Sequence, residues 1–153
     1  MSKQEVRKNS ETSLDIVSDC LDVATGYRKK RMYNDAEIYF LKVTEQLEQL
    51  VRTEDSDENW ISLIDTYGKL ALMFDEVKDI ERAKKYYLRA MEIMEDRVAE
   101  NKLEYVSGLV ACCNCLGVLI ESIDCFRKAY TYAQLNPDDP ICKDTIETWS
   151  DVF

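Results

Sequence analysis

Residues 67–90, YGKLALMFDEVKDIERAKKYYLRA, decide the fold that we expect for this chain. Apolar residues in the first half of this stretch recur three or four positions apart, which places them on one face of a helix. The same spacing resumes after Asp79, a residue type that caps helix N-termini. The two faces carry Tyr67, Leu70, Ala71 and Phe74, and then Ala83, Tyr87 and Ala90. The stretch therefore predicts two antiparallel helices joined by a short turn.

The same skeleton of small and large residues occurs three times. In each copy, a compact residue of the first helix precedes a small residue of the second by 12 positions: Ala24 and Ala36, Ala71 and Ala83, Val110 and Ser122. Larger residues flank them: Val23, Tyr27, Phe40 and Val43; Leu70, Phe74 and Tyr87; Leu109, Cys113 and Phe126. Small residues let two helices cross about 8–10 Å apart. Aromatic residues beside the crossing then fill the groove between the helices.

This skeleton resembles the tetratricopeptide repeat, a helix–turn–helix unit of about 34 residues. The second copy matches best, whereas the third departs from the family at Cys113, where an aromatic residue is expected, and at Ser122, where Ala is expected. The copies are also further apart than in the family, with 47 residues from Ala36 to Ala83 and 39 from Ala83 to Ser122. The resemblance implies repeats at about 17–50, 64–97 and 103–136, and a capping helix at 140–153.

The fold class predicted for the chain is all-α, with about seven helices in an antiparallel helix-hairpin solenoid. No segment alternates with period two, and 4 Gly and 2 Pro are too few for a sandwich or barrel with a turn every ten residues or so. A length of 153 residues favours one domain. We place this domain at 13–153 and a flexible, charged N-terminal tail at 1–12.

Several local features of the helices are also predicted. The first helix begins at Ser13, and Asn34 with Glu37 forms a capping box at the start of the second. Gly117 marks the turn of the third hairpin. Trp149 and Phe153 of the last helix close the exposed apolar end of the solenoid.

Acidic residues outnumber basic residues by 30 to 20, which gives a net charge of −10. Nucleic acids and anionic membranes bind proteins through Lys and Arg, so we predict neither as a partner. The one basic run, RKKR at 28–31, is interpreted as a solvated turn, with a phosphate or nuclear-import patch as the alternative. The N-terminus lacks the apolar core of a secretory signal, and the longest apolar run, 108–120, is shorter than the ~20 residues of a membrane span. These features predict a cytoplasmic protein.

The chain has six cysteines and no histidine. Cys112 and Cys115 form a CxxC pair close to Cys113, with Cys125 and Cys142 further along. A zinc site needs a second pair or His ligands, and a redox pair belongs at a helix N-terminus after a strand. We therefore interpret these cysteines as thiols that pack in the core. A cysteine-based metal-binding or thiol-switch protein is the alternative.

No catalytic, cofactor-binding or metal residues are predicted, and the chain is not expected to be an enzyme. The lack of histidine excludes Ser–His and Cys–His nucleophile systems. Four scattered glycines cannot form a phosphate-binding loop. The abundant carboxylate pairs are those expected of an acidic, solvated surface.

The resemblance implies a binding surface instead. In tetratricopeptide repeat proteins, the first helices of successive hairpins line a concave groove that receives an extended peptide or a partner helix. Carried over to this chain, the groove holds Leu21, Thr25, Arg28, Asp65, Gly68, Leu72, Glu104, Ser107, Ala111 and Asn114. One subgroup of the family holds acidic chaperone tails with Lys, Asn and Arg, but here only Arg28 fits that requirement.

We therefore predict a non-catalytic protein–protein interaction module or scaffold without a cofactor. The net charge and the groove together favour a basic or amphipathic protein or peptide as the partner. Binding through the convex face is the alternative to binding in the groove. The open apolar ends of a solenoid also allow self-association.

Overall fold

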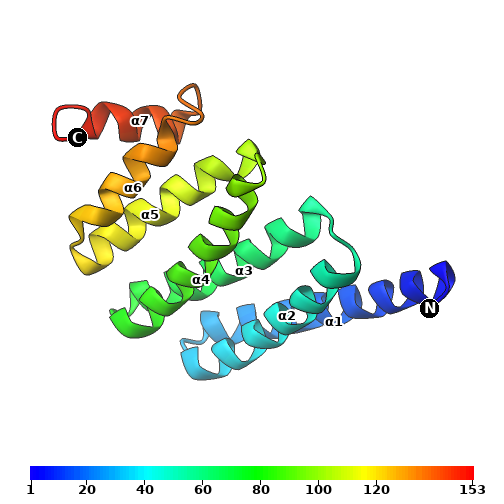
Figure 1. Ribbon diagram of the computed structural model, residues 1–153. Helices are drawn as coiled ribbons and strands as arrows, with labels where there is room; N and C mark the ends of the chain where they lie inside the picture. Colours follow the sequence, from blue (N-terminus) through cyan, green and yellow to red (C-terminus); the bar gives the residue numbers. More distant parts are fainter. The chain divides into compact units, whose positions relative to one another are not determined.

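The computed structural model describes all 153 residues, with Ser10 described by its backbone alone. The described residues are 83% helical and contain no strand, which confirms the all-α class. Seven α-helices and one 3₁₀-helix follow one another along the chain (Figure 1): α1 (Lys3–Lys29), α2 (Tyr33–Thr53), α3 (Asp57–Glu76), α4 (Ile80–Ala99), η1 (Leu103–Tyr105), α5 (Val106–Ile120), α6 (Ile123–Ala133) and α7 (Pro140–Trp149).

The chain divides into two compact units. Unit 1, Met1–Phe74, holds α1, α2 and nearly all of α3, and unit 2, Asp75–Phe153, holds the end of α3 and the remaining helices. The boundary falls inside the predicted second repeat, 64–97. The single domain predicted for 13–153 and its stacking as a solenoid stay predictions.

In unit 1, α1 and α2 form an antiparallel hairpin (Figure 1). Ala24 and Ala36, the small residues of the predicted skeleton, are both fully buried. The chain reverses at Arg31, which has a left-handed backbone with φ of 60°. Beside the turn, the rings of Tyr27 and Tyr39 stack with their centroids 5.6 Å apart.

The helix α3 is linked to α2 by a hydrogen bond between side chains. The hydroxyl of Tyr67 donates to Oε1 of Glu48 over 2.7 Å. Leu63 and Leu70 of α3 are buried in the core, as are the large side chains Phe40 and Leu47 of α2. Their burial supplies the main driving force for this unit, at roughly 1.5–3 kcal/mol for each large apolar side chain.

Two predicted helix starts in unit 1 are wrong. The first helix begins at Lys3 rather than Ser13, because Ser2 and Glu5 form a capping box that satisfies the backbone N–H groups of both residues. The flexibility predicted for residues 1–12 stays a prediction. The second helix has its N-cap at Met32, so Asn34 already lies in its first turn and is not the cap.

In unit 2, α5 is the central helix and packs against α4, α6 and α7. The side chains of Leu109, Val110 and Leu116 are buried there. The segment Leu103–Ile120 has the length and mean hydropathy, 1.8, that a membrane span could have, and 44% of it is buried inside the structure. The predicted cap of α4 is confirmed, since Asp79 accepts a hydrogen bond from the backbone N–H of Arg82.

The predicted turn at Gly117 is wrong. The helix α5 continues through Gly117 to Ile120, and the chain reverses at Glu121, whose φ is 53°. Gly117 is instead required for close packing, because a Cβ at this position would lie 2.8 Å from Cε1 of Phe126. Phe126 thus occupies the space that a side chain of residue 117 would need.

The observed turn displaces the third hairpin by about one helical turn from its predicted register. In the first two copies, the left-handed residue precedes the small residue of the second helix by five positions: Arg31 and Ala36, Lys78 and Ala83. Five positions after Glu121 is Phe126 rather than Ser122. In the first helix, Tyr27 and Phe74 precede the left-handed residue of their turn by four positions. In the third hairpin, Gly117 has this position. At these two positions, the third hairpin therefore has its small residue on the first helix and its large residue on the second, the reverse of the other two hairpins.

The last helix packs on the third hairpin as predicted. Asp139 caps α7 by accepting hydrogen bonds from the backbone N–H groups of Ile141 and Cys142. The ring of Trp149 stacks on Phe126 with centroids 4.7 Å apart and contacts Phe153 at 5.6 Å. These rings cover the apolar side of α6.

Candidate functional site

The predicted groove residues of unit 1 lie on α1 and α3. Leu21, Thr25 and Arg28 are four and three positions apart, so they share one face of α1. Thr25 is exposed, and the other two side chains are half-buried. This face is partly open to solvent and carries one positive charge.

The corresponding face of α3 exposes an apolar side chain. Leu72 is 48% exposed, one turn from Gly68. A Cβ added to Gly68 would meet no atom within 4 Å, so the space beside Leu72 is open. Asp65 lies one turn further back and forms an ion pair with Lys69, 3.2 Å from Oδ2 to Nζ. Both charges are exposed, so this pair contributes little to stability.

In unit 2, α7 occupies part of the predicted groove. Glu104 lies exposed in η1, and Ala111 is half-buried on α5. Nδ2 of Asn114 donates to Oγ1 of Thr145 in α7 over 3.0 Å. Ser107 contacts the carboxylate that caps α7. Two of the four predicted residues on this surface therefore hold the last helix in place.

The cap of α7 is electrostatically well supported. The backbone N–H of Cys142, together with the side chain of Ser107 and the backbone N–H of Ile141, holds the pKa of Asp139 below its usual range. A charged carboxylate is therefore maintained at the N-terminus of α7, where the helix dipole also favours it.

The sequence-based register missed two exposed residues of α5. Thr25 and Leu72 each precede the left-handed residue of their turn by six positions, and Cys115 does so in the third hairpin. Val118, which is 71% exposed, likewise corresponds to Arg28. The only sequence signal for this register is the mutual spacing of Gly117 and Phe126, because Glu121 is not a residue type that marks a left-handed turn.

The prediction that Cys115 packs in the core is wrong: Cys115 is exposed and belongs to a polar cluster formed by residues of three helices. The hydroxyl of Tyr87 on α4 donates to Oδ2 of Asp75, at the end of α3, over 3.1 Å. Tyr87 also shares a side-chain hydrogen bond with Cys115. Desolvation raises the pKa of both Cys115 and Tyr87. The cluster therefore presents neutral donors beside one carboxylate rather than a thiolate nucleophile.

The remaining thiols of α5 are core groups. The Sγ of Cys112 donates to the carbonyl oxygen of Tyr87 over 3.3 Å, and that of Cys113 lies 3.6 Å from Sδ of Met91. Burial raises the pKa of Cys112 and of Cys113 to about 12, and that of Cys142 to about 11. All six cysteines are free thiols. Among the residues that the structure describes, no group of three His, Cys, Asp or Glu side chains gathers as a metal ion would require.

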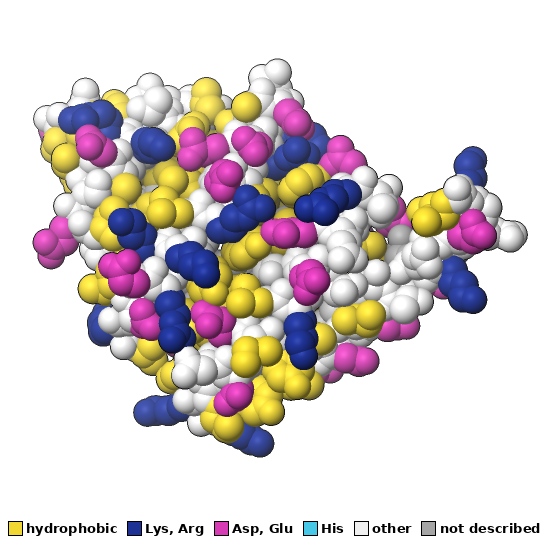
Figure 2. All heavy atoms as spheres, turned by 60° about the horizontal axis from the view of Figure 1, so that its bottom comes forward, with side chains coloured by type: hydrophobic (Ala, Val, Ile, Leu, Met, Phe, Trp, Pro, Cys, Tyr) yellow, Lys and Arg dark blue, Asp and Glu magenta, His cyan; other side chains and the backbone are white. Residues whose placement is uncertain are grey.

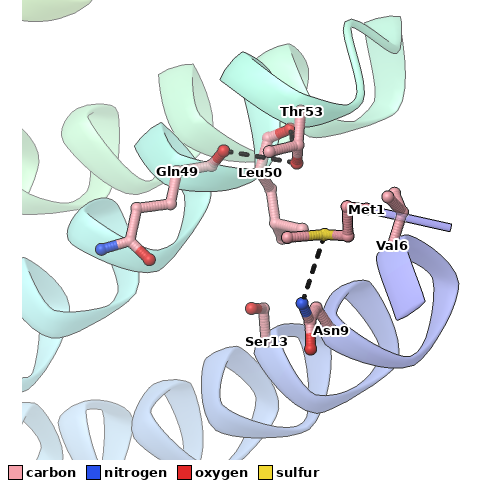
Figure 3. A pocket seen from close by; sticks show the side chains of 7 residues that line it. All are labelled: Met1, Val6, Asn9, Ser13, Gln49, Leu50 and Thr53. Atoms are coloured by element: carbon pink, nitrogen blue, oxygen red, sulfur yellow. Dashed lines mark hydrogen bonds between the residues drawn. The ribbon is translucent and has the colours of Figure 1, made fainter.

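A small cavity of about 190 Å³ lies at the open end of the α1–α2 hairpin (Figure 3). It is lined by Met1, Val6, Asn9, Ser13, Gln49, Leu50 and Thr53. The Nδ2 of Asn9 donates to Sδ of Met1 over 3.7 Å. Its lining carries no titratable side chain, and the side chain of Met1 lies within it (Figure 3). We therefore interpret this cavity as a packing gap between the ends of two helices.

Charges of both signs are mixed over the surface. On the face shown in Figure 2, Lys and Arg side chains alternate with Asp and Glu side chains, and hydrophobic side chains lie between them. On this face the acidic side chains are interspersed with basic ones rather than collected in one patch.

No protein-family model, curated protein or solved structure matches this chain. The tetratricopeptide resemblance therefore stays a prediction that rests on the small and large residues of the three hairpins. Function has to be inferred from the surfaces described above.

Proposed function

We propose that this protein is a non-catalytic interaction module, a tetratricopeptide-like scaffold that binds a basic or amphipathic peptide segment or partner helix. In this proposal the three hairpins stack as a solenoid closed by the helix at 140–153. The protein acts in the cytoplasm and uses no metal or cofactor.

The observation that carries the proposal is the exposed Leu72 on α3. Leu72 lies beside the open space at Gly68, at a position that corresponds to Thr25 in the first hairpin. An apolar side chain with an open notch next to it supports a contact with an apolar anchor of a partner.

The charge of the chain supports a cationic ligand. With a net charge of −10, the protein attracts Lys- and Arg-rich segments and repels acidic ones. Long-range attraction between exposed charges is screened at high ionic strength. Affinity for the partner should therefore fall with salt but persist in part, because the apolar contact at Leu72 is not screened.

The experiment compares two exposed apolar residues of unit 1. An array of twelve-residue peptides carries apolar residues at varied spacing, flanked either by Lys and Arg or by Asp and Glu. We expect the basic set to bind. Leu72→Glu should weaken the best peptide by about tenfold or more, the loss of one apolar anchor. Ile38→Glu on α2, where Ile38 is 52% exposed, should change its affinity by less than about twofold.

Three outcomes would contradict the proposal. Equal losses in the two variants would place binding elsewhere than on this face of α3. Binding of the peptides flanked by Asp and Glu would contradict the prediction that the ligand is cationic. Stoichiometric zinc in the purified protein, measured by elemental analysis, would favour the cysteine-based alternative instead.

A further inference from the structure

A second surface, entirely within unit 2, is hollowed and apolar. The hollow has a volume of about 350 Å³ and lies between the end of α5, the start of α6 and the end of α7. Its lining consists of Gly117, Val118, Glu121, Ile123, Phe126 and Trp149. Ligand pockets begin at about 300 Å³, so this hollow can hold one large side chain with its neighbouring backbone.

The aromatic part of the lining is held firmly. Phe126 stacks on Trp149 on one side and lies against the backbone of Gly117 on the other. The backbone N–H of Ser122 donates to the carbonyl oxygen of Gly117 over 3.0 Å, which fixes the turn beside the hollow. A site that is already formed loses little conformational entropy when a ligand binds.

Two aliphatic side chains of the lining stand in solvent. Val118 is 71% exposed and Ile123 is 49% exposed, on either side of the turn at Glu121. Val118 lies inside α5, two residues before its end at Ile120, and Ile123 is the first residue of α6. An apolar ligand side chain would cover both of them at once.

The surroundings of the hollow are acidic. Glu121 is part of the lining, and the exposed acids Asp124, Glu147 and Asp151 lie within two residues of other lining positions in the sequence. The neighbouring base, Arg127, is bound to Asp124 over 2.8 Å and also lies over the ring of Phe153. The unbalanced charge at this surface is therefore negative.

We propose that this hollow binds a linear peptide segment in which a Leu, Ile or Phe side chain is flanked by Lys or Arg. The apolar side chain lies against Phe126 and Trp149, and the flanking cations face Glu121 and the neighbouring acids. A second copy of the chain is a poorer occupant, because each copy carries a net charge of −10. The site uses none of the residues on α3, so it stands or fails separately from the function proposed for Leu72.

Trp149 provides the measurement. The chain has two tryptophans, and Trp60→Phe leaves Trp149 as the single emitter. The probe is a twelve-residue Gly/Ser peptide with one central leucine and two lysines on each side. Two matched peptides replace the lysines by glutamates or the leucine by serine. We expect a saturable shift of Trp149 emission, with at least about tenfold higher affinity for the probe than for either matched peptide.

Substitutions in the full chain locate the site. Val118→Glu should weaken the probe by about tenfold or more, and because Val118 is exposed, this variant should keep its helical circular dichroism. Ile123→Glu provides a second, independent variant with the same expectation. Leu88→Glu on α4, where Leu88 is 38% exposed, is a control that should leave the affinity unchanged.

The proposal is overturned if no peptide shifts the emission or if the glutamate peptide binds as well as the probe. It is also overturned if both Val118→Glu and Ile123→Glu bind normally. An emission change that follows protein concentration, together with a dimer in sedimentation equilibrium, would assign the hollow to a second copy instead.

Discussion

The α1–α2 and α5–α6 hairpins bring their helices together with opposite arrangements of side chains. In the first, Ala24 and Ala36 are fully buried, and the large ring of Phe40 is buried beside them on α2. In the second, Gly117 of α5 makes room for the ring of Phe126 on α6. Close helix packing thus requires a small residue in the contact, but it does not fix which helix supplies it.

This exchange has a consequence for the surface of unit 2. Phe40 lies in the core of its unit, whereas Phe126 is half-buried and lines the hollow. In unit 2, α7 covers one side of the Phe126 ring through Trp149. The other side remains available for a ligand. The irregular hairpin is therefore the one that offers a binding site.

The largest effect should come from removing the buried ring of the regular hairpin. Phe40→Ala should lower the free energy of unfolding of unit 1 by about 3–5 kcal/mol, because it leaves a large cavity in the core. Phe126→Ala should cost unit 2 less, about 1–2 kcal/mol, since the ring is already partly in water. Urea denaturation followed by Trp60 emission reports on unit 1, and Trp149 emission reports on unit 2.

The comparison uses two single-tryptophan backgrounds, Trp149→Phe for Phe40→Ala and Trp60→Phe for Phe126→Ala. Each substitution is measured against its own background protein. Equal losses in the two hairpins would show that Phe126 is as well covered as Phe40. That result would contradict the difference between the two crossings.

The thiols of α5 should make unit 2 sensitive to alkali. Burial raises the pKa of Cys112 and Cys113 to about 12, so both stay protonated in the folded state while the unfolded chain ionises near pH 9. The unfolded state therefore binds fewer protons, and stability falls as the pH rises from about 9 towards 12. Together, these two thiols should lower the free energy of unfolding of unit 2 by about 2–3 kcal/mol at pH 10.

Urea denaturation between pH 8 and 10, followed by Trp149 emission, measures this slope. In the Cys112→Ala, Cys113→Ala double variant the slope should become shallower but not vanish, because the raised pKa values of Cys115 and Cys142 also contribute to it. An unchanged slope would mean that other groups of unit 2 cause the alkaline loss. The same buried thiols should resist maleimide labelling in native protein at neutral pH.

The helices could be predicted from sequence because their apolar residues recur with helical spacing. The start of α1 could not, because residues 3–12 have no apolar stripe and gain their helical start from the capping box of Ser2. The turn at Glu121 was missed for a different reason. Glu121 adopts a left-handed backbone with φ of 53°, although Glu is not a residue type that marks such a turn.

The binding surface was harder to predict than the fold. Leu72 is exposed on α3, and its place in a binding groove stays a prediction. Asn114 was placed in the groove, but its amide bonds to Thr145, a residue 31 positions away that no local pattern connects to it. Val118 was missed because its position depends on the register of the turn.

The smallest predicted effects on stability come from substituting two glycines that lie within helices, Gly117 and Gly68. Gly117→Ala should destabilise unit 2 by about 1–2 kcal/mol, because the new Cβ would lie 2.8 Å from the ring of Phe126 and force it to move. Gly68→Ala meets no atom within 4 Å and should stabilise unit 1 by about 0.5–1 kcal/mol, the ordinary gain of Ala over Gly in a helix. Urea denaturation of both variants measures the difference in sign. If Gly117→Ala also stabilised the protein, Gly117 would not be required for the contact with Phe126. Combining Gly117→Ala with Phe126→Leu, which removes the clashing ring atoms, should recover most of the loss, since residues in direct contact have non-additive effects.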